Sequence, residues 1–181
     1  LDHFPESNRQ PVGHIVDIVG AASDPGIEGQ VAVRTQDLPY QFSEEAMAQA
    51  KAFGDTIDAQ TANSRLDLRD LPFVTIDGED AKDFDDAVCA TPRGKNGWTL
   101  WVAIADVAHY VTDNSPLDQT AIERGTSVYF PSEVIPMLPE TLSNGLCSLN
   151  PHVDRLALAV CLEIASTGRV TKYRFHEVVF Q

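Results

Sequence analysis

The densest group of potentially reactive side chains lies in residues 77–86, Asp-Gly-Glu-Asp-Ala-Lys-Asp-Phe-Asp-Asp. Six of these ten residues are carboxylates, and only Lys82 opposes their charge. Carboxylates at this density repel one another at neutral pH unless water or cations relieve them. A solvated surface loop is the ordinary interpretation of such a run. A cation site is favoured by the apolar segments on both sides, by the small Gly78 and Ala81, and by the predominance of Asp over Glu.

Oxygen ligands alone favour a hard cation such as Mg²⁺, Mn²⁺ or Ca²⁺. The calcium-binding EF-hand template fails in every register, because Ala81, Lys82 or Ala87 falls at a ligand position. A D-x-D phosphotransferase motif at Asp83 and Asp85 fits poorly, because that motif should directly follow an apolar strand. The remaining interpretation is a carboxylate set for one or two Mg²⁺ ions, with Mn²⁺ as an alternative, as used in phosphodiester hydrolysis.

The residues around this segment resemble the catalytic domain of the ribonuclease II / ribonuclease R family, closest to its ribonuclease R branch. Residues 71–88 carry the family's Asp-x5-Asp-x-Asp-Asp spacing, and four later segments agree in order and spacing: 101–107, 125–131, 135–139 and 142–149. The likeness runs from about residue 65 to the end. The first 50 or so residues more weakly resemble the end of a cold-shock domain.

The resemblance implies a Mg²⁺-dependent 3′→5′ exoribonuclease that takes the 3′ end of single-stranded or structured RNA and releases nucleoside 5′-monophosphates. It implies that Asp77, Asp83 and Asp86 are metal ligands, and that Asp85 is the catalytic residue that activates water. Tyr129 matches an aromatic residue that stacks on the 3′-terminal base, a contact that tolerates any base. Without the resemblance, Tyr129 would be interpreted as a half-buried strand tyrosine.

Two alternatives stay open: a non-catalytic RNA-binding domain of the same fold, and a generic divalent-cation-binding domain. Other polar residues have structural interpretations. We expect His109 to be structural rather than a general base, and Asp106 to brace the loop after an apolar strand, with a supporting role near the metals as an alternative. Cys147 and Cys161 are expected in the core.

The fold class expected is α+β: a mixed, mostly antiparallel sheet with a few helices, preceded by a β-rich remnant of an OB-type cold-shock domain. Three regions are expected, namely the cold-shock remnant with a helix over 1–53, a linker over 54–66, and the first half of the catalytic domain over 67–181. Strands are predicted at 12–20, 30–35, 73–76, 87–90, 98–105, 155–164 and 170–180. Helices are predicted at 44–53 after the cap Ser43, at 116–125 after the cap Ser115, and as a short element within 139–146.

The net charge of −14 argues against a nucleic-acid partner unless the carboxylates hold cations or basic surfaces lie elsewhere in a longer protein. The first residues lack the basic and apolar regions of a signal peptide, and no apolar run is long enough for a membrane span. Three cysteines without a CxxC pattern indicate reduced thiols in a cytoplasmic protein. Because residue 1 is Leu, we expect a piece of a longer protein. We expect that longer protein to be monomeric. The family's second half supplies an arginine, a glutamate and another aromatic residue, so the piece alone is expected to be inactive or very weak.

Overall fold

The computed structural model describes residues 10, 12–79, 81–131 and 133–181. These residues divide into two units, which are described separately. The small unit contains the described part of Leu1–Tyr40 together with Tyr129–Val134, and the main unit contains Gln41–Val128 and Ile135–Gln181. No helix in the described residues has the length and apolar character needed to cross a lipid bilayer.

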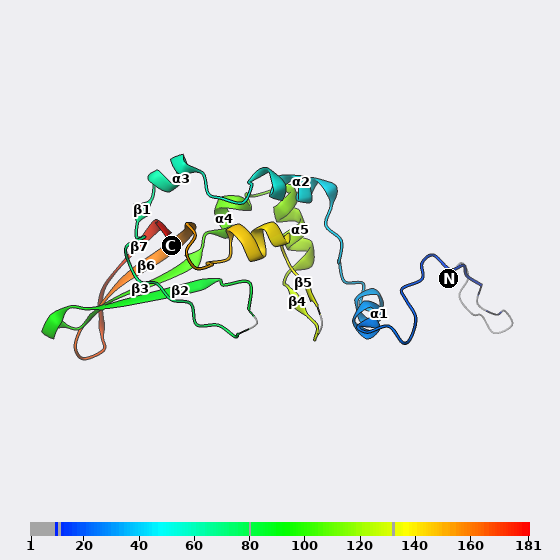
Figure 1. The fold of residues 1–181 in the computed structure, drawn as a ribbon, viewed down its shortest axis with the longest axis horizontal. Coiled ribbons are helices and arrows are strands. Elements are labelled where there is room, and N and C mark those ends of the chain that lie inside the picture. The colour runs from blue at the N-terminus through cyan, green and yellow to red at the C-terminus, as the bar shows by residue number, and fades with distance from the viewer. Residues whose placement is uncertain (1–9, 11, 80, 132) are drawn as a thin grey trace. The chain divides into compact units, whose positions relative to one another are not determined.

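The main unit is built on a five-stranded sheet with the order β1-β7-β6-β3-β2 (Figure 1). Its strands are β1 Leu66–Asp67, β2 Asp86–Pro92, β3 Trp98–Ala105, β6 Arg155–Ile164 and β7 Val170–Phe180. Every neighbouring pair is antiparallel except β1 and β7, which are parallel. The expected α+β class is confirmed, and β3, β6 and β7 have the predicted bounds. β3 lies inside the sheet, as expected from its apolar sequence.

The β2–β3 connection requires a glycine at one position. Gly97 has φ +106, and a Cβ added there would lie 1.9 Å from the carbonyl oxygen of Ile164. Both the left-handed backbone and the close approach of β6 therefore exclude larger residues. The 3₁₀ turn Gly94–Asn96 completes this connection.

Helices cover the alanine-rich part of the sheet. They are α2 Glu44–Ala52, α3 Ala59–Asn63, α4 Val107–Tyr110, α5 Pro116–Arg124 and the π-helix η2 Thr141–Leu146. The predicted caps are confirmed: the Ser43 side chain accepts from the Ala46 N–H at 3.1 Å, and the Ser115 side chain accepts from the Asp118 N–H at 3.2 Å. In Figure 1, α2, α4 and α5 gather at the end of the sheet opposite the β2–β3 turn. The core combines small strand residues with helix leucines, among them Ala103, Ala157, Ala159, Leu117, Leu142 and Leu146.

The strand predicted at 30–35 is wrong, because these residues belong to helix α1, Ile27–Thr35. Residues 13–20, predicted as part of a strand, form no ladder, and the side chains of Ile15, Val16 and Ile18 are at least 80% exposed. A strand needs a neighbour to satisfy its backbone and cover its apolar face. Among the described residues, β4 Val128–Tyr129 pairs with β5 Val134–Ile135.

Two predictions in the main unit also need correction. The strand expected at 73–76 is reduced to a single bridge, in which the backbone groups of Val74 pair with those of Val88 at 2.9 and 2.8 Å. Residues 54–66 are not a featureless linker. They form α3, which is capped by Asp58, and they place Arg65 in a largely buried ion pair.

The acidic segment comprises residues 77–86, and Ser148 binds its second half to the core. Its side chain is fully buried, accepts from the Phe84 N–H at 3.1 Å and donates to the Lys82 carbonyl at 2.8 Å. Its own carbonyl accepts from Nε of the buried Arg155 at 2.8 Å. One small residue therefore satisfies two backbone groups of the acidic segment that could not otherwise be buried.

We predict that Ser148→Ala lowers the free energy of unfolding by about 1–3 kcal/mol, because the Phe84 N–H and the Lys82 carbonyl lose their partner in a buried setting. Urea unfolding followed by circular dichroism measures this change. Ser143→Ala is the matched control, since that hydroxyl donates to the side-chain oxygen of the neighbouring Asn144 at 3.2 Å rather than to the backbone of the acidic segment. Equal stability of the two variants would contradict the role given to Ser148.

Candidate metal centre

The acidic segment connects the Val74 bridge to the start of β2, and its two halves are held differently. In the second half, the Leu149 N–H donates to the Phe84 carbonyl at 2.9 Å, and the Ala105 N–H donates to the Asp85 carbonyl at 2.9 Å. These bonds add to those of Ser148 and fix the backbone beside Asp85 from two directions. The first half has a turn, in which the Ala81 N–H donates to the Gly78 carbonyl at 3.1 Å. Asp80 lies outside the described residues.

The four aspartates singled out by spacing act electrostatically on one another. The pKa of the Asp85 carboxyl is raised above its ordinary value, first by partial burial and then by the negative charges of Asp83, Asp86 and Asp77. The Asp85 side chain is exposed to solvent, although protein atoms lie on one part of its surroundings. The fold therefore concentrates like charge around Asp85, a state that a bound cation would relieve.

The chemistry of these donors fits a hard divalent cation, because all four side chains offer carboxylate oxygens. Within the described residues, no three His, Cys, Asp or Glu side chains converge on one point that could hold a metal ion. Mg²⁺ in proteins commonly uses only one or two carboxylates and keeps several water molecules. The aspartates therefore suit a water-rich magnesium site better than a fully enclosed one.

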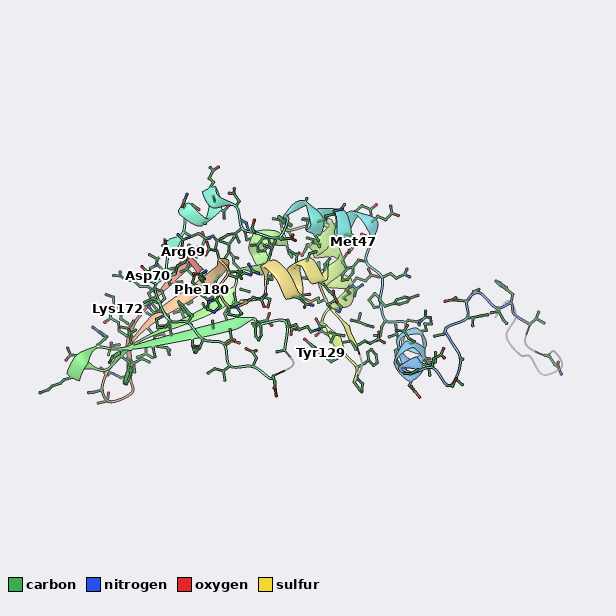
Figure 2. The ribbon with its side chains drawn as sticks, viewed as in Figure 1. Met47, Arg69, Asp70, Tyr129, Lys172 and Phe180 are labelled. Carbon is green, nitrogen blue, oxygen red and sulfur yellow. The ribbon has the colours of Figure 1, made fainter. Side chains whose placement is uncertain are left out.

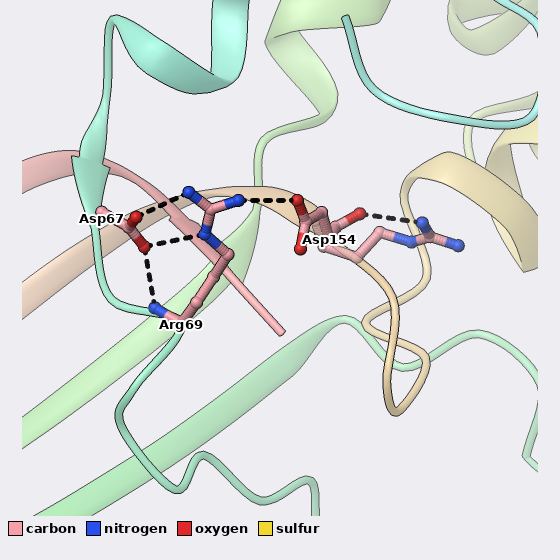
Figure 3. Close-up of polar contacts among 4 residues, drawn as sticks. Asp67, Arg69 and Asp154 are labelled. Atoms are coloured by element: carbon pink, nitrogen blue, oxygen red, sulfur yellow. Dashed lines mark hydrogen bonds and ion pairs between the residues drawn. The ribbon is translucent and has the colours of Figure 1, made fainter. Parts of the chain in front are cut away.

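A network of arginines and aspartates connects to Ser148, which holds the acidic segment. Arg69 donates to both carboxylate oxygens of Asp67 at 2.9 and 2.6 Å, and to the Asp154 carboxylate at 3.0 Å (Figure 3). The Asp154 carbonyl accepts from the Arg155 guanidinium at 2.9 Å. Arg69 holds the pKa of Asp67 well below its usual range, at about 2. Through Arg155, this network reaches Ser148 and so the acidic segment.

Asp106 forms a second brace. Its carboxylate pairs with Arg65 at 2.6 Å, and the two side chains are only 15% and 5% exposed. This pair joins the end of β3 to the segment before β1, as the bracing role predicted. The nearby Cys147 thiol is buried, and burial followed by the charges of Asp106 and Asp85 raises its pKa to about 12. Cys147 is therefore a protonated core residue rather than a nucleophile.

Tyr129 lies in β4, within the small unit, and its side chain is 64% exposed. It is labelled in Figure 2. The structure thus gives this residue an accessible ring rather than the half-buried position typical of a strand tyrosine. His109 packs edge-on against Tyr110 with ring centroids 4.8 Å apart, in keeping with a structural role.

Sequence reasoning missed Ser148, Arg155 and Arg65. A charged residue at the head of an apolar strand was a usable signal for Arg155, because a buried cation needs partners. Nothing in the local pattern indicated that Ser148 is fully buried, since its role depends on contacts with residues more than sixty positions earlier.

Comparison with known families gives two matches: the RNB domain over residues 65–181 and the cold-shock domain over residues 1–43. Among curated relatives, ribonuclease R of Acidithiobacillus ferrooxidans is 54% identical over 97% of this chain and 40% of its own length. Ribonuclease R of Escherichia coli K12 is 50% identical over 99% of this chain and 22% of its own length. The chain therefore spans well under half the length of these relatives.

Among solved structures, ribonuclease R of Mycoplasma genitalium in complex with double-stranded RNA matches with a TM-score of 0.82 and 34% identity, over 90% of this chain and 29% of that one. The same enzyme has been solved with ribose-methylated single-stranded RNA, at the same TM-score of 0.82. The RNB match covers more than half of the chain and includes all four aspartates. This chain belongs to the RNB domain family, together with the ribonuclease R proteins that it resembles.

Proposed function

We propose that the protein containing this chain is a 3′→5′ exoribonuclease that hydrolyses single-stranded or structured RNA to nucleoside 5′-monophosphates with Mg²⁺. The observation that carries the proposal is the set of four aspartates at family spacing, crowded around Asp85 and held by buried bonds. The RNA bound by the matched Mycoplasma genitalium enzyme supports RNA as the partner.

The proposed roles of the aspartates are those that the family resemblance implies. Asp77, Asp83 and Asp86 would hold the cation, and Mg²⁺ bound there would supply charge stabilisation for the phosphodiester and lower the pKa of water. Asp85 orients the attacking water by accepting a hydrogen bond at a carboxylate oxygen. Its raised pKa brings it closer to that of an effective general base. The hydrogen bonds from Ser148 to Lys82 and Phe84, and from the Ala105 N–H to the Asp85 carbonyl, fix the backbone that carries the Asp85 side chain.

The exposed ring of Tyr129 is proposed to stack on the 3′-terminal base. Stacking reads the face that every base has, which suits an enzyme that degrades RNA of any sequence. We further propose that the protein works in the cytoplasm, where Cys89, Cys147 and Cys161 remain thiols.

The direct test supplies uniformly labelled single-stranded RNA and Mg²⁺ to the gene product that contains this chain. We expect nucleoside 5′-monophosphates from the 3′ end and a loss of about 10²–10⁴-fold in rate for Asp85→Asn. Asp70→Asn is the matched control, because Asp70 is exposed and lies outside the acidic segment. It is labelled in Figure 2.

An unaltered protein that releases no mononucleotides would refute the proposed activity. The 181-residue chain alone is proposed to be inactive or far slower, because the relatives are much longer and the resemblance assigns further site residues to their remaining length. Mononucleotide release by the chain alone at the rate of the whole gene product would overturn this second statement.

Asp85→Asn is also predicted to raise the melting temperature of the chain in EDTA at neutral pH. The folded pKa of Asp85 lies above its ordinary value, so its charge weakens the fold as pH rises through that range. The difference should shrink below about pH 4, where the unfolded chain also binds the proton.

Mg²⁺ should stabilise the unaltered chain and the Asp70→Asn control while stabilising Asp85→Asn less. Thermal unfolding followed by circular dichroism, with and without EDTA, gives both comparisons. A melting temperature for Asp85→Asn that is lower than that of the control in EDTA would show that Asp85 is not under like-charge repulsion.

Tyr129→Ala is predicted to weaken binding of the RNA 3′ end to the gene product by about 1–3 kcal/mol, because one base loses its stacking surface. Tyr129→Phe keeps a ring and should bind normally. Fluorescence anisotropy with a labelled single strand measures both, with Tyr40→Ala as a control for loss of another exposed tyrosine. Unchanged binding by Tyr129→Ala would remove this residue from the proposed RNA contact.

A further inference from the structure

A cavity of about 290 Å³ lies on the main sheet, apart from the acidic segment. β3, β6 and β7 contribute alternate residues to it: Trp101 is paired with Cys161, Cys161 with Arg174, and Glu163 with Lys172. Residues at alternate positions share one face of a sheet, so these side chains project together. The volume is near the lower end for small-molecule sites and suits a single nucleotide.

Cationic side chains gather at this cavity although the chain carries a net charge of −14. The cations Lys172 and Arg174 occupy alternate positions of β7 and line it, and the imidazole of His176 follows them two positions further along the strand. Lys172 is labelled in Figure 2. Glu163 is the acidic lining residue, and it already pairs with Arg93 at 2.9 Å and Lys172 at 3.7 Å.

Arg174 makes no ion pair with any side chain in the described part of the chain. The pKa of the Cys161 thiol is raised, first by burial and then by the charge of Glu163, while Arg174, Arg93 and Lys172 each oppose that rise. These three cations therefore lie in a small region around the Glu163 carboxylate. Their mutual repulsion makes the region favourable for an anion.

An aromatic surface adjoins these cations. The Trp101 indole lines the cavity, and its centroid lies 5.6 Å from that of His176, with the rings inclined at 50°. Indole rings stack on nucleic-acid bases, and flexible cations beside them bind phosphate. The combination of one aromatic ring, two or three cations and space for one nucleotide is what a base–phosphate unit requires.

We propose that this cavity binds one nucleotide unit of a single RNA strand, with the base against Trp101 and the phosphate against Lys172 and Arg174. The choice of RNA rests on the proposed function. The cavity is a contact for the strand separate from the acidic segment: Ile104, the partner of Asp86, lies three positions along β3 from Trp101 and therefore projects from the opposite face of the sheet. It allows the strand to be held while the 3′ end is processed elsewhere.

The two tryptophans of the chain provide an internal comparison. Trp98 and Trp101 lie three residues apart on β3, so they project from opposite faces of the sheet. Trp98→Phe leaves Trp101 as the only tryptophan, and Trp101→Phe leaves Trp98. Short oligouridylate, added in EDTA, should quench the emission of Trp101 and leave that of Trp98 unchanged.

Charge reversal tests the phosphate contact. Arg174→Glu should weaken the binding of oligouridylate at least tenfold and reduce the salt dependence by about one phosphate contact. Lys51→Glu makes the same change of charge on the exposed side of α2 and should bind normally. Arg174→Lys should recover part of the affinity, and melting temperatures verify that each variant is folded.

The proposal would be overturned by quenching of both tryptophans alike, by equal loss of binding in Arg174→Glu and Lys51→Glu, or by binding of inorganic phosphate without quenching by oligouridylate. Quenching by free uridine monophosphate as tight as by the oligonucleotide would also overturn it, since the site would then bind free nucleotides. In EDTA, Asp85→Asn should still show the quenching. Binding without hydrolysis therefore counts against the proposed activity alone, and hydrolysis without binding counts against this cavity alone.

Discussion

The hydrogen bonds of a buried serine determine how this chain presents its acidic residues. Ser148 is fully buried and contacts the backbone on both sides of Asp83, while its own carbonyl is fixed by Arg155. Without such partners, the peptide groups beside Asp85 would have to be solvated, and the segment would move away from the core. The arginine pairs behind Ser148 complete this support, because Arg69 and Asp154 hold the strand from which Arg155 extends.

The hydrogen bonds of Ser148 hold the acidic segment in place although its carboxylates repel one another. Four aspartates lie close enough that three of them raise the pKa of the fourth, and partial burial adds to the effect. A sequence selected for stability alone would not place a carboxylate there. The cost is understandable in a centre that binds a cation, since the same repulsion in the free protein becomes attraction toward the ion. The negative net charge of the chain has the same origin in part, and the cationic cavity on the sheet stands out against it.

Much of the fold was predictable because local signals agreed with the final contacts. The alternating and apolar runs of β3, β6 and β7 gave their bounds, and Ser43 and Ser115 marked two helix starts. The small unit was less predictable, because the β-branched residues at 30–35 fit a strand pattern but fold as a helix. At the site, spacing identified Asp77, Asp83, Asp85 and Asp86, whereas Ser148 and Arg65 act through distant contacts that leave no periodic trace in the sequence.

We propose that the acidic segment, held by Ser148, is a divalent-cation site. Titration of the chain with Mn²⁺, followed by the loss of the free-ion signal in electron paramagnetic resonance, tests this proposal directly. We expect saturable binding that Mg²⁺ displaces, that weakens strongly in Asp77→Asn and Asp85→Asn, and that is unchanged in Asp70→Asn. Binding that is equally strong in all of these variants, or no binding by the unaltered chain, would contradict it.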